Sequence, residues 1–322
     1  MKRSPLLSVA MPPHTHFGIS VAEIHLNQLL ALIPAAAGGV LLWGLPGLRT
    51  LLLAVGTTVV LEWLTGRMMK RETSVLDGSA LVQGLMLGML LHAAAPWWLV
   101  LIGALLLVVL AKQFFGGQGG YLLQPVLLTY AILLISWPGQ LNTAWRLGGL
   151  ATAAQPIEPL LAWQSFGPGA ADAYPLGNLL LGLQTGGVAS GMIGLLALGG
   201  IYLIIRGFIA WRIPLAFLGM AFVAALALHL GDATTYAPPG LHLFSGMLVF
   251  AAFFMATDFS CAPVNPWAQV IFGASCGLLA ILIRTFGSYP DGTVFAVLLM
   301  NLVQPLIDRV HPPVIGVEVA SR

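Results

Sequence analysis

Long runs of apolar residues, separated by short polar stretches, dominate the chain from residue 27 to residue 308. A helix needs roughly 20 consecutive apolar residues to cross the hydrocarbon core of a bilayer. By this measure the pattern predicts an all-α, polytopic membrane protein with about ten transmembrane helices. The predicted segments are 27–45, 48–65, 79–95, 97–114, 124–139, 178–206, 212–231, 240–257, 266–285 and 291–308.

Two of these segments are interrupted by glycines. The third contains "GLMLGMLLHAAAP" and the sixth contains "LQTGGVASG". Irregular backbone is tolerated at membrane depth only where protein or a cavity covers it. We therefore expect one or both segments to be broken or re-entrant, and the sequence does not decide which.

The composition excludes an ordinary soluble domain. Hydrophobic residues make up 58% of the 322 residues and charged residues only 7%, whereas an average soluble domain carries about a quarter charged residues. The formal net charge of +2 is too small, and its charges too scattered, to indicate nucleic-acid binding. Residues 1–26 lack a continuous apolar core, so we expect a short tail rather than a cleaved signal peptide.

Basic residues are unevenly distributed over the two ends of the predicted helices. If the amino terminus is cytoplasmic, ten lie inside and three outside, which is a clear positive-inside bias. Both termini are then cytoplasmic. The inner group is Lys2, Arg3, Arg67, Lys70, Arg71, Lys112, Arg206, Arg212, Arg309 and Arg322, and the outer group is Arg49, Arg146 and Arg284.

The predicted helices divide into two sets of five. The first set occupies 27–139 and the second 178–308, with tails at 1–26 and 309–322. The longest stretch that is not apolar, 140–177, joins the two sets on the outer face.

The two sets resemble each other. "PWWLVLIGALLLVVLAKQFFGG" from Pro96 is echoed by "PWAQVIFGASCGLLAILIRTFGS" from Pro266, so that Lys112 corresponds to Arg284. Because five is odd, equivalent helices must cross the bilayer in opposite directions. The pattern therefore predicts an inverted repeat, a design in which sites form at the repeat interface near the midplane.

The stretch "AKQFFGGQGG", residues 111–120, combines one lysine with four glycines. It lacks the GxxxxGK[ST] spacing of a phosphate-binding loop and follows a membrane helix rather than a strand. Glycine supplies the backbone freedom that tight turns need. A turn is the favoured interpretation, although its glycines also allow a ligand or partner to approach the backbone.

Charged residues within or beside the helices suggest local partners. We expect Glu62, near the end of the second segment, to pair with Arg67 or Lys70 at the membrane interface, and an ion or proton relay is the alternative. Asp291 lies before the tenth segment, where a carboxylate stabilises the amino terminus of a helix.

Histidines and cysteines do not form a recognisable metal motif. His92, His229 and His242 are predicted near the outer face, but no HxxxH or HxxE spacing connects them, so we expect hydrogen bonding rather than metal binding. Cys261 and Cys276 are fifteen positions apart without a CxxC motif, which favours two separate buried thiols.

Several stretches resemble the RnfD/NqrB family of subunits from redox-driven ion-pumping complexes, and RnfD more closely. These are "MPPHTHFGISV" at 11–21, "DGSALVQGLMLGMLL" at 77–91, "AKQFFGGQGG", "LHLFSGMLVFAAFFMATD" at 241–258 and "IFGASCGLLAILIRTFGSYPDGTVFAVLLMNLVQPLID" at 271–308. The similarity covers nearly the whole chain.

The resemblance implies a ten-helix inverted repeat akin to urea transporters, in the bacterial inner membrane. Members work beside an NADH-oxidising C-type subunit, an iron–sulfur B-type subunit, a flavin-bearing G-type subunit and small membrane subunits of A and E type. Electrons pass between NADH and ferredoxin, or to another acceptor, while Na+ or H+ crosses the membrane. The family also implies FMN, attached through its phosphate to a threonine in an S-x-A-T motif.

This chain departs from the family at that motif. In "GGLATAAQPIEPLL" at 148–161, either Gln155 or Ala154 occupies the threonine position, depending on the register. Neither side chain has a hydroxyl, so we expect covalent FMN to be absent. Thr152 lies nearby, but the usual upstream aspartate is missing.

Two further flavin-associated places differ as well, at "SGML" 245–248 and "GYLLQPV" 120–126. We therefore expect flavin to bind without a covalent bond or not at all, and the sequence does not tell whether riboflavin binds. The candidate non-covalent contacts are Ser79, Lys112, Gly116, Gly117, Ser245, Asp291 and Gly292.

Three functions are compatible with the sequence. The first is an RnfD-like membrane subunit that helps to couple redox steps to cation movement. The second is a channel or carrier for a small solute on the same scaffold, and the third is a scaffold subunit that only anchors partners.

Overall fold

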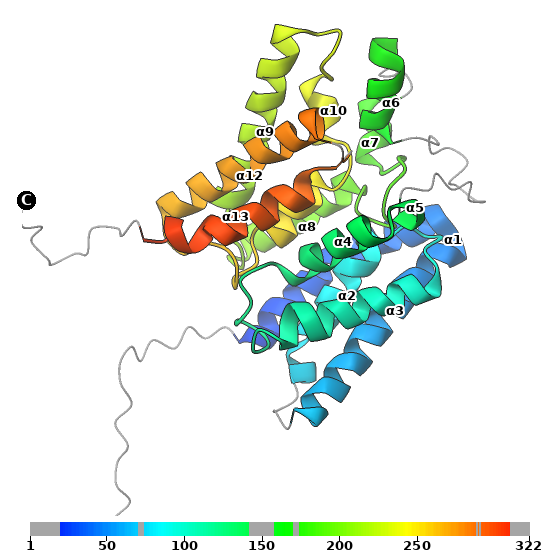
Figure 1. Ribbon diagram of the computed structural model, residues 1–322, viewed down its shortest axis with the longest axis vertical. Coiled ribbons are helices and arrows are strands. Elements are labelled where there is room, and N and C mark those ends of the chain that lie inside the picture. The colour runs from blue at the N-terminus through cyan, green and yellow to red at the C-terminus, as the bar shows by residue number, and fades with distance from the viewer. Residues whose placement is uncertain are drawn as a thin grey trace, which may run out of the picture.

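The computed structural model describes residues 20–69, 74–141, 158–169, 174–287, 289 and 291–309. These residues are helical or irregular and contain no strand, which confirms the all-α prediction (Figure 1). The helices are α1 (Val21–Met68), η1 (Ser74–Asp77), α2 (Ser79–Leu90), α3 (Trp97–Leu105), η2 (Leu106–Gln113), α4 (Pro125–Ser136), α5 (Pro138–Leu141), α6 (Pro159–Phe166), α7 (Leu176–Leu180), α8 (Ile193–Ile205), α9 (Arg212–Gly231), α10 (Pro239–Leu243), α11 (Leu248–Phe250), η5 (Ala251–Met255), α12 (Pro266–Phe286) and α13 (Thr293–Ile307).

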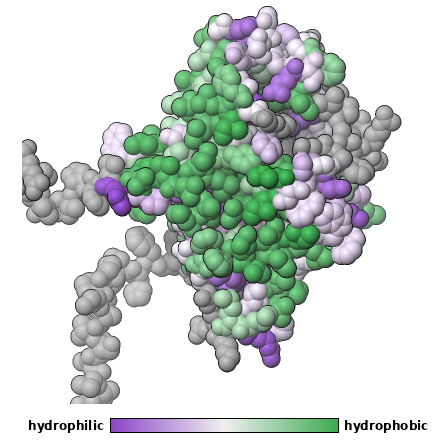
Figure 2. All heavy atoms as spheres, in the orientation of Figure 1, coloured by the Kyte–Doolittle hydropathy of each residue, from purple (hydrophilic) through white to green (hydrophobic). Residues whose placement is uncertain are grey.

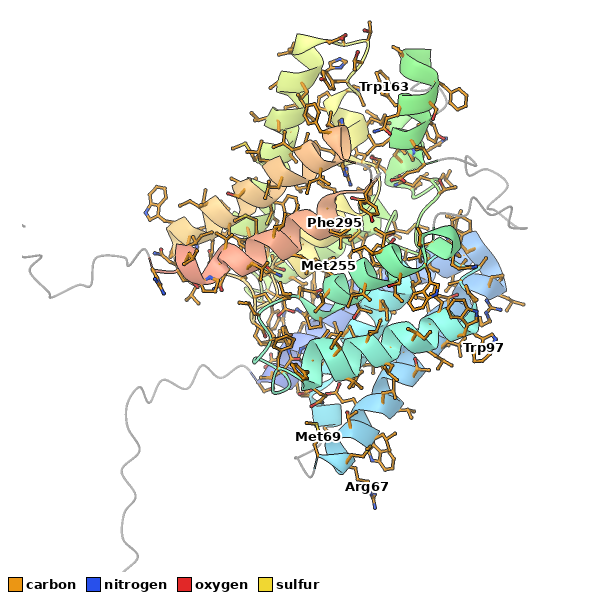
Figure 3. All side chains as sticks on the ribbon, in the orientation of Figure 1. Arg67, Met69, Trp97, Trp163, Met255 and Phe295 are labelled. Carbon is orange, nitrogen blue, oxygen red and sulfur yellow. The ribbon has the colours of Figure 1, made fainter. Side chains whose placement is uncertain are left out.

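The first two predicted segments are joined in α1, which bends sharply between them. Gly44 has φ 66° and ψ −148°, a conformation outside the helical region that glycine adopts readily. Pro46 follows and removes a backbone donor. The bend divides α1 into two legs, and Figure 3 shows Arg67 projecting from the free end of the second leg.

Within the described residues, three helices, α1, α9 and α12, are long and apolar enough to cross a membrane, by length and composition. Five further apolar stretches are shorter, with 10–17 residues: α2, α3 with η2, α4, α8 and α13. Hydrophobic residues cover much of the face seen in Figure 2, and many leucines, valines and phenylalanines are exposed. The molecule is therefore a membrane protein whose helices include several of less than full membrane length.

The structure breaks both glycine-interrupted segments, as the sequence predicts. The third segment ends as a helix at Leu90, and the sixth consists of α7, an irregular stretch from residue 181 to 192, and α8. The eighth segment is also broken, at Ser245 and Gly246 between α10 and α11, which the sequence pattern did not indicate.

Backbone from the second half of the chain closes the end of α2. Val188 N donates to Leu91 O at 2.8 Å, and Ala189 N donates to Met89 O at 3.1 Å. A Cβ atom on Gly187 would lie 2.4 Å from Leu90 O, so only glycine allows this approach. These bonds satisfy carbonyl groups that the end of a helix leaves without intrahelical donors.

Each half contains a close helix contact built on two glycines four residues apart, Gly84 and Gly88 in α2 and Gly273 and Gly277 in α12. In α2, a Cβ on Gly84 would lie 2.0 Å from Thr58 Oγ1 of α1. In α12, Gly273 and Gly277 face α9, and a Cβ on Gly277 would lie 2.2 Å from Phe217 O. Small residues let membrane helices approach closely where no hydrophobic driving force acts.

We predict that Gly277→Ala destabilises the protein by about 1–3 kcal/mol, because the added methyl group meets backbone that has no room to move. Gly219→Ala in α9 is the matched control, since nothing lies within 4 Å of its added Cβ. It should change stability by less than about 1 kcal/mol. Thermal unfolding in detergent measures both, and equal effects would contradict the close contact.

Candidate functional site

A buried lysine joins α1, α2 and η2. Lys112 Nζ donates to Glu62 Oε1 at 2.6 Å, to Glu62 Oε2 at 2.7 Å and to Ser79 Oγ at 2.6 Å. The relative exposure of Lys112 is 0% and that of Glu62 is 1%. Ser79 Oγ in turn donates to Asp77 Oδ1 at 2.7 Å. We call these four residues the Lys112 cluster.

The local backbone explains the position of the lysine. Lys112 lies in η2, which has π-helical geometry, and helices of this kind occur often at functional sites. The chain then turns away through Gly116 (φ 107°) and Gly117 (φ 97°), and Gly117 N donates to Lys112 O at 3.1 Å. The "AKQFFGGQGG" stretch is therefore a turn that presents the lysine to the interior.

The structure corrects the expected pairing of Glu62 with Arg67. The Glu62 carboxylate lies inside the protein and binds Lys112. The Arg67 guanidinium lies over the Trp63 ring, 5.6 Å from the ring centroid. Lys70, the other expected partner, is outside the described residues. Sequence reasoning failed here because Lys112 is fifty positions away from Glu62.

A buried arginine forms a second cluster in the other half. Arg284 Nη2 donates to Asp291 Oδ1 at 2.9 Å and to Thr293 Oγ1 at 3.2 Å. Arg284 Nη1 donates to His242 O at 2.7 Å, and Nη2 also donates to Ser245 O at 3.3 Å. We call these five residues the Arg284 cluster.

Asp291 has the expected role at a helix start and an additional one. Thr293 N donates to Asp291 Oδ1 at 3.2 Å at the beginning of α13. Met247 N donates to Asp291 Oδ2 at 2.8 Å. The same carboxylate therefore binds the backbone at the break between α10 and α11. The ion pair with Arg284 was not predicted.

The two clusters share a short sequence signal. Asp77-Gly78-Ser79 and Asp291-Gly292-Thr293 each begin a helix, and in each the aspartate Oδ1 accepts from the backbone N and the hydroxyl of the third residue. That hydroxyl then accepts from the buried cation. A D-G-[ST] motif repeated in both halves is visible in the sequence and marks both positions.

The candidate residues named from the sequence lie in two places rather than one. Ser79, at the first residue of α2, lies with Lys112, Gly116 and Gly117. Ser245, Asp291 and Gly292 belong to the Arg284 region, where a cavity lined by Asp291 also contacts Leu90 at the last residue of α2. The clusters thus lie towards opposite ends of α2, whose 12 residues give it a length of about 18 Å at about 1.5 Å per residue.

A small pocket of about 10 Å³ lies at the Lys112 end of α2. Tyr121 Oη donates to Asp258 Oδ2 at 3.2 Å, and Gln83 Nε2 donates to Tyr121 Oη at 3.4 Å. His25 Nδ1 lies 2.8 Å from Asp77 O. The pocket has room for about one water molecule, and its polar wall combines residues from both halves.

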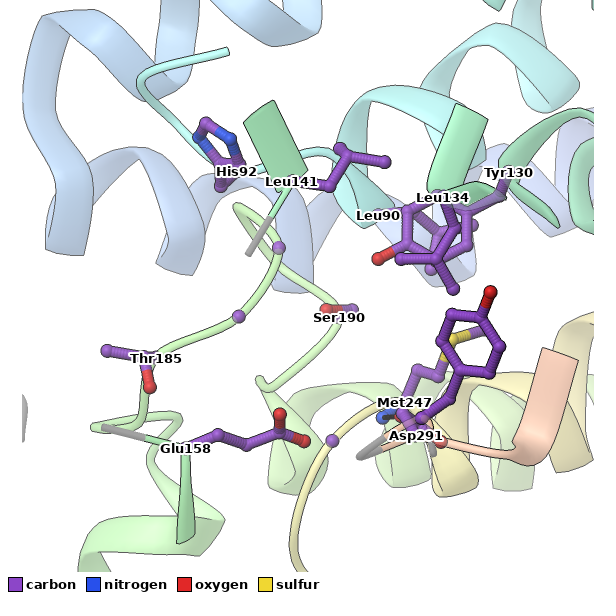
Figure 4. A pocket seen from close by; sticks show the side chains of 14 residues that line it. Leu90, His92, Tyr130, Leu134, Leu141, Glu158, Thr185, Ser190, Met247 and Asp291 are labelled. Carbon is purple, nitrogen blue, oxygen red and sulfur yellow. Dashed lines mark hydrogen bonds between the residues drawn. The ribbon is translucent and has the colours of Figure 1, made fainter. Parts of the chain in front are cut away.

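A larger cavity of about 100 Å³ lies at the Arg284 end (Figure 4). Glu158 points into it from the start of α6, and we call it the Glu158 cavity. Its other lining residues are Leu90, His92, Tyr130, Leu134, Leu141, Thr185, Gly186, Gly187, Ser190, Gly246, Met247, Tyr289 and Asp291.

The cavity is electrostatically unfavourable for an anion. Burial is the largest cause that raises the pKa of Glu158 to about 7, and the neighbouring Asp291 carboxylate is the second. The Arg284 guanidinium lowers this pKa. Two carboxyl groups therefore face a space that already disfavours negative charge.

Neither the Glu158 cavity nor the pocket beside Tyr121 has room for a flavin. Pockets for ligands of that size usually have about 300–1,000 Å³, whereas the two cavities have about 100 and 10 Å³. The carboxyl groups of Glu158 and Asp291 would also repel the phosphate of FMN. Ala154, Gln155 and Thr152 lie outside the described residues, so the misfit concerns only the two cavities.

Of the three histidines named from the sequence, His92 and His229 form hydrogen bonds as expected, whereas the buried Nδ1 of His242 has no partner within the described residues. His92 Nε2 binds Gln140 O, and His229 Nδ1 lies 2.8 Å from Tyr236 O. Cys261 and Cys276 are both buried and free, as predicted. Within the described residues, no three side chains of the metal-binding kinds come together.

The fold and the two clusters define a helical membrane protein with buried charge pairs at both ends of a broken helix. Its sequence matches the NQR2, RnfD, RnfE family over residues 8–316. The chain belongs to this family, which confirms the resemblance identified from the motifs.

Several known D subunits are similar to this chain over nearly their full length. The chain is 38% identical to the D subunit of the ion-translocating oxidoreductase complex of Halorhodospira halophila, with 94% of each chain covered. It is 37% identical to the D subunit of the Na(+)-translocating ferredoxin:NAD(+) oxidoreductase complex of Acetobacterium woodii, covering 94% of this chain and 93% of that one. It is 33% identical to the D subunit of the proton-translocating ferredoxin:NAD(+) oxidoreductase complex of Clostridium ljungdahlii, with 96% of each covered.

We predict that Lys112→Met destabilises the protein by about 3–5 kcal/mol, because it leaves the Glu62 carboxylate buried without its cation. The double variant Lys112→Met/Glu62→Gln should recover most of this loss. Unfolding of the purified variants in detergent supplies the double-mutant cycle. Losses that simply add would show that the two side chains do not depend on each other.

We also predict a pH-dependent effect of Glu158→Gln. The folded protein raises the pKa of this carboxyl from 4.5 to about 7, so ionisation costs stability as the pH rises through that range. The variant should therefore melt at a higher temperature than the parent at pH 8 and at the same temperature near pH 4.5. A difference that is independent of pH would contradict the shifted pKa.

Proposed function

We propose that the protein is the D-type membrane subunit of an ion-translocating electron transport complex, in which redox chemistry between NADH and ferredoxin drives Na+ or H+ across the membrane. The similarity over nearly the full length to D subunits of such complexes carries this proposal. Relatives of similar identity are named for sodium and for protons, so the names do not select the ion.

The proposal includes an inverted repeat of two five-helix halves. It is supported by the position of the Lys112 and Arg284 clusters at opposite ends of α2, and by the paired-glycine contact in each half. Figure 1 shows the described ends of the chain, at the start of α1 and the end of α13, on the same side of the molecule. This agrees with both termini being cytoplasmic in a bacterial inner membrane.

The partners proposed are the C-type, B-type and G-type redox subunits and the small A- and E-type membrane subunits. Covalent FMN is proposed to be absent from this chain, because neither Gln155 nor Ala154 offers a hydroxyl. The limited space in the Glu158 cavity and in the pocket beside Tyr121 supports a role in which other subunits carry the flavins. It also gives no support to a solute channel, which needs a wide continuous path.

We predict that the tagged chain, expressed with its neighbouring genes and purified in mild detergent, brings down flavin- and iron–sulfur-containing subunits. After denaturing electrophoresis under ultraviolet light, a partner band should fluoresce and the band of this chain should not. Fluorescence at this band would refute the absence of covalent flavin. Purification as a monomer or homo-oligomer without redox partners would refute the complex.

A further inference from the structure

The Glu158 cavity contains polar groups that the fold does not use. No hydrogen bond to the Glu158 carboxylate occurs within the described residues. Ser190, whose relative exposure is 5%, lines the cavity and its hydroxyl has no partner there either. Thr185 Oγ1 is buried and has no hydrogen-bond partner in the same part of the chain. Buried hydroxyls are nearly always hydrogen-bonded, so two unused ones in the wall that also carries Glu158 indicate a missing ligand.

When Glu158 is ionised, the charges around the cavity favour a positive ligand. Arg284 pairs with Asp291 and also acts on Glu158, so two carboxyl groups share one cation and one negative charge is left when both are ionised. Leu90, the last residue of α2, forms part of the wall, and the carboxyl end of a helix favours cations. The remaining groups that titrate and face the cavity are His92, Tyr130 and Tyr289, and none of them supplies a permanent positive charge.

The donor atoms and the size narrow the class of cation. Carboxylate and hydroxyl oxygens are hard ligands, which suit alkali and alkaline-earth ions rather than copper or zinc. One uncompensated carboxylate balances a single positive charge. A cavity of about 100 Å³ accepts a small ion with a few water molecules.

We propose that the Glu158 cavity binds one monovalent alkali cation, through the Glu158 carboxylate and the hydroxyls of Ser190 and Thr185. This proposal rests on the proposed function in one respect: the cation bound at the Arg284 end of α2 is then the ion that the complex transports. The binding itself is independent of that function and is measured on the purified chain.

The experiment compares sodium with choline, which is too large for the cavity, at equal ionic strength. Equilibrium binding of radioactive sodium to the purified, full-length protein at pH 8 should show one saturable site. Sodium chloride should raise the melting temperature above that in choline chloride. A protein that binds no sodium, or that choline stabilises equally, overturns the proposal.

Variants separate the cavity from other acidic positions. Glu158→Gln should abolish saturable sodium binding, and Ser190→Ala should weaken it roughly tenfold, a loss of one ligand. Glu23→Gln, at the start of α1 and far along the chain from the cavity, is the matched control and should bind sodium normally. Unchanged binding in Glu158→Gln overturns the proposal.

If Glu158→Gln does not fold, Ser190→Ala decides the outcome. A sodium affinity of Ser190→Ala equal to that of the parent would contradict the proposed site. If the purified complex assembles but the chain binds no sodium, the cavity proposal fails and the proposed function stands. If sodium binds but no redox partner co-purifies, the proposed function fails and the site stands.

Discussion

A charged side chain inside a membrane protein must have a partner, and this requirement governs the structure. An unpaired charge at the bilayer centre costs about 2.5–3.5 kcal/mol even on the mildest scale, so Lys112 and Arg284, at 0% relative side-chain exposure, depend on Glu62 and Asp291. Each pair is completed by a hydroxyl at the start of a helix, Ser79 or Thr293. The pairs thereby fix where α2 and α13 begin, and they bind the ends of short helices to longer ones.

The broken helices follow from the same need to satisfy polar groups. Helix α2 has 12 residues, too few to cross the hydrocarbon alone, and its last carbonyls bind backbone amides from residues 188–190. Ion pairs at one end and backbone bonds at the other keep the polar groups of these helix ends away from lipid. As a result, polar side chains collect beside the breaks, and the Glu158 cavity lies at such a place. The proposed ion site therefore lies between the end of α2 and the start of α6 rather than on the face of one helix.

The sequence predicted the features that depend on local pattern. Apolar runs marked the helical stretches, and glycines marked two segments of which one or both were expected to be broken. The count of ten spans and the repeat that relates Lys112 to Arg284 stay predictions. It did not predict that Glu62 reaches Lys112 or that Glu158 faces Asp291, because those contacts join distant segments and depend on how the halves pack. The break at Gly246 was also missed: its φ of 66° is required by Asp291 and Met247, which lie far apart in the sequence. The family was identifiable from motifs, whereas the absence of covalent FMN stays a prediction because Ala154 and Gln155 lie outside the described residues.

The central claim is that the two buried cations lie at opposite faces of the membrane, as an inverted repeat requires. Phe115 and Phe286 are exposed at 43% and 65% and follow Lys112 and Arg284 closely. Single cysteines at these positions, in a background without Cys261 and Cys276, can be labelled in spheroplasts with a membrane-impermeant maleimide. An inverted repeat predicts that Phe286→Cys reacts in intact spheroplasts and Phe115→Cys only after lysis. Labelling of both from the same side would contradict it.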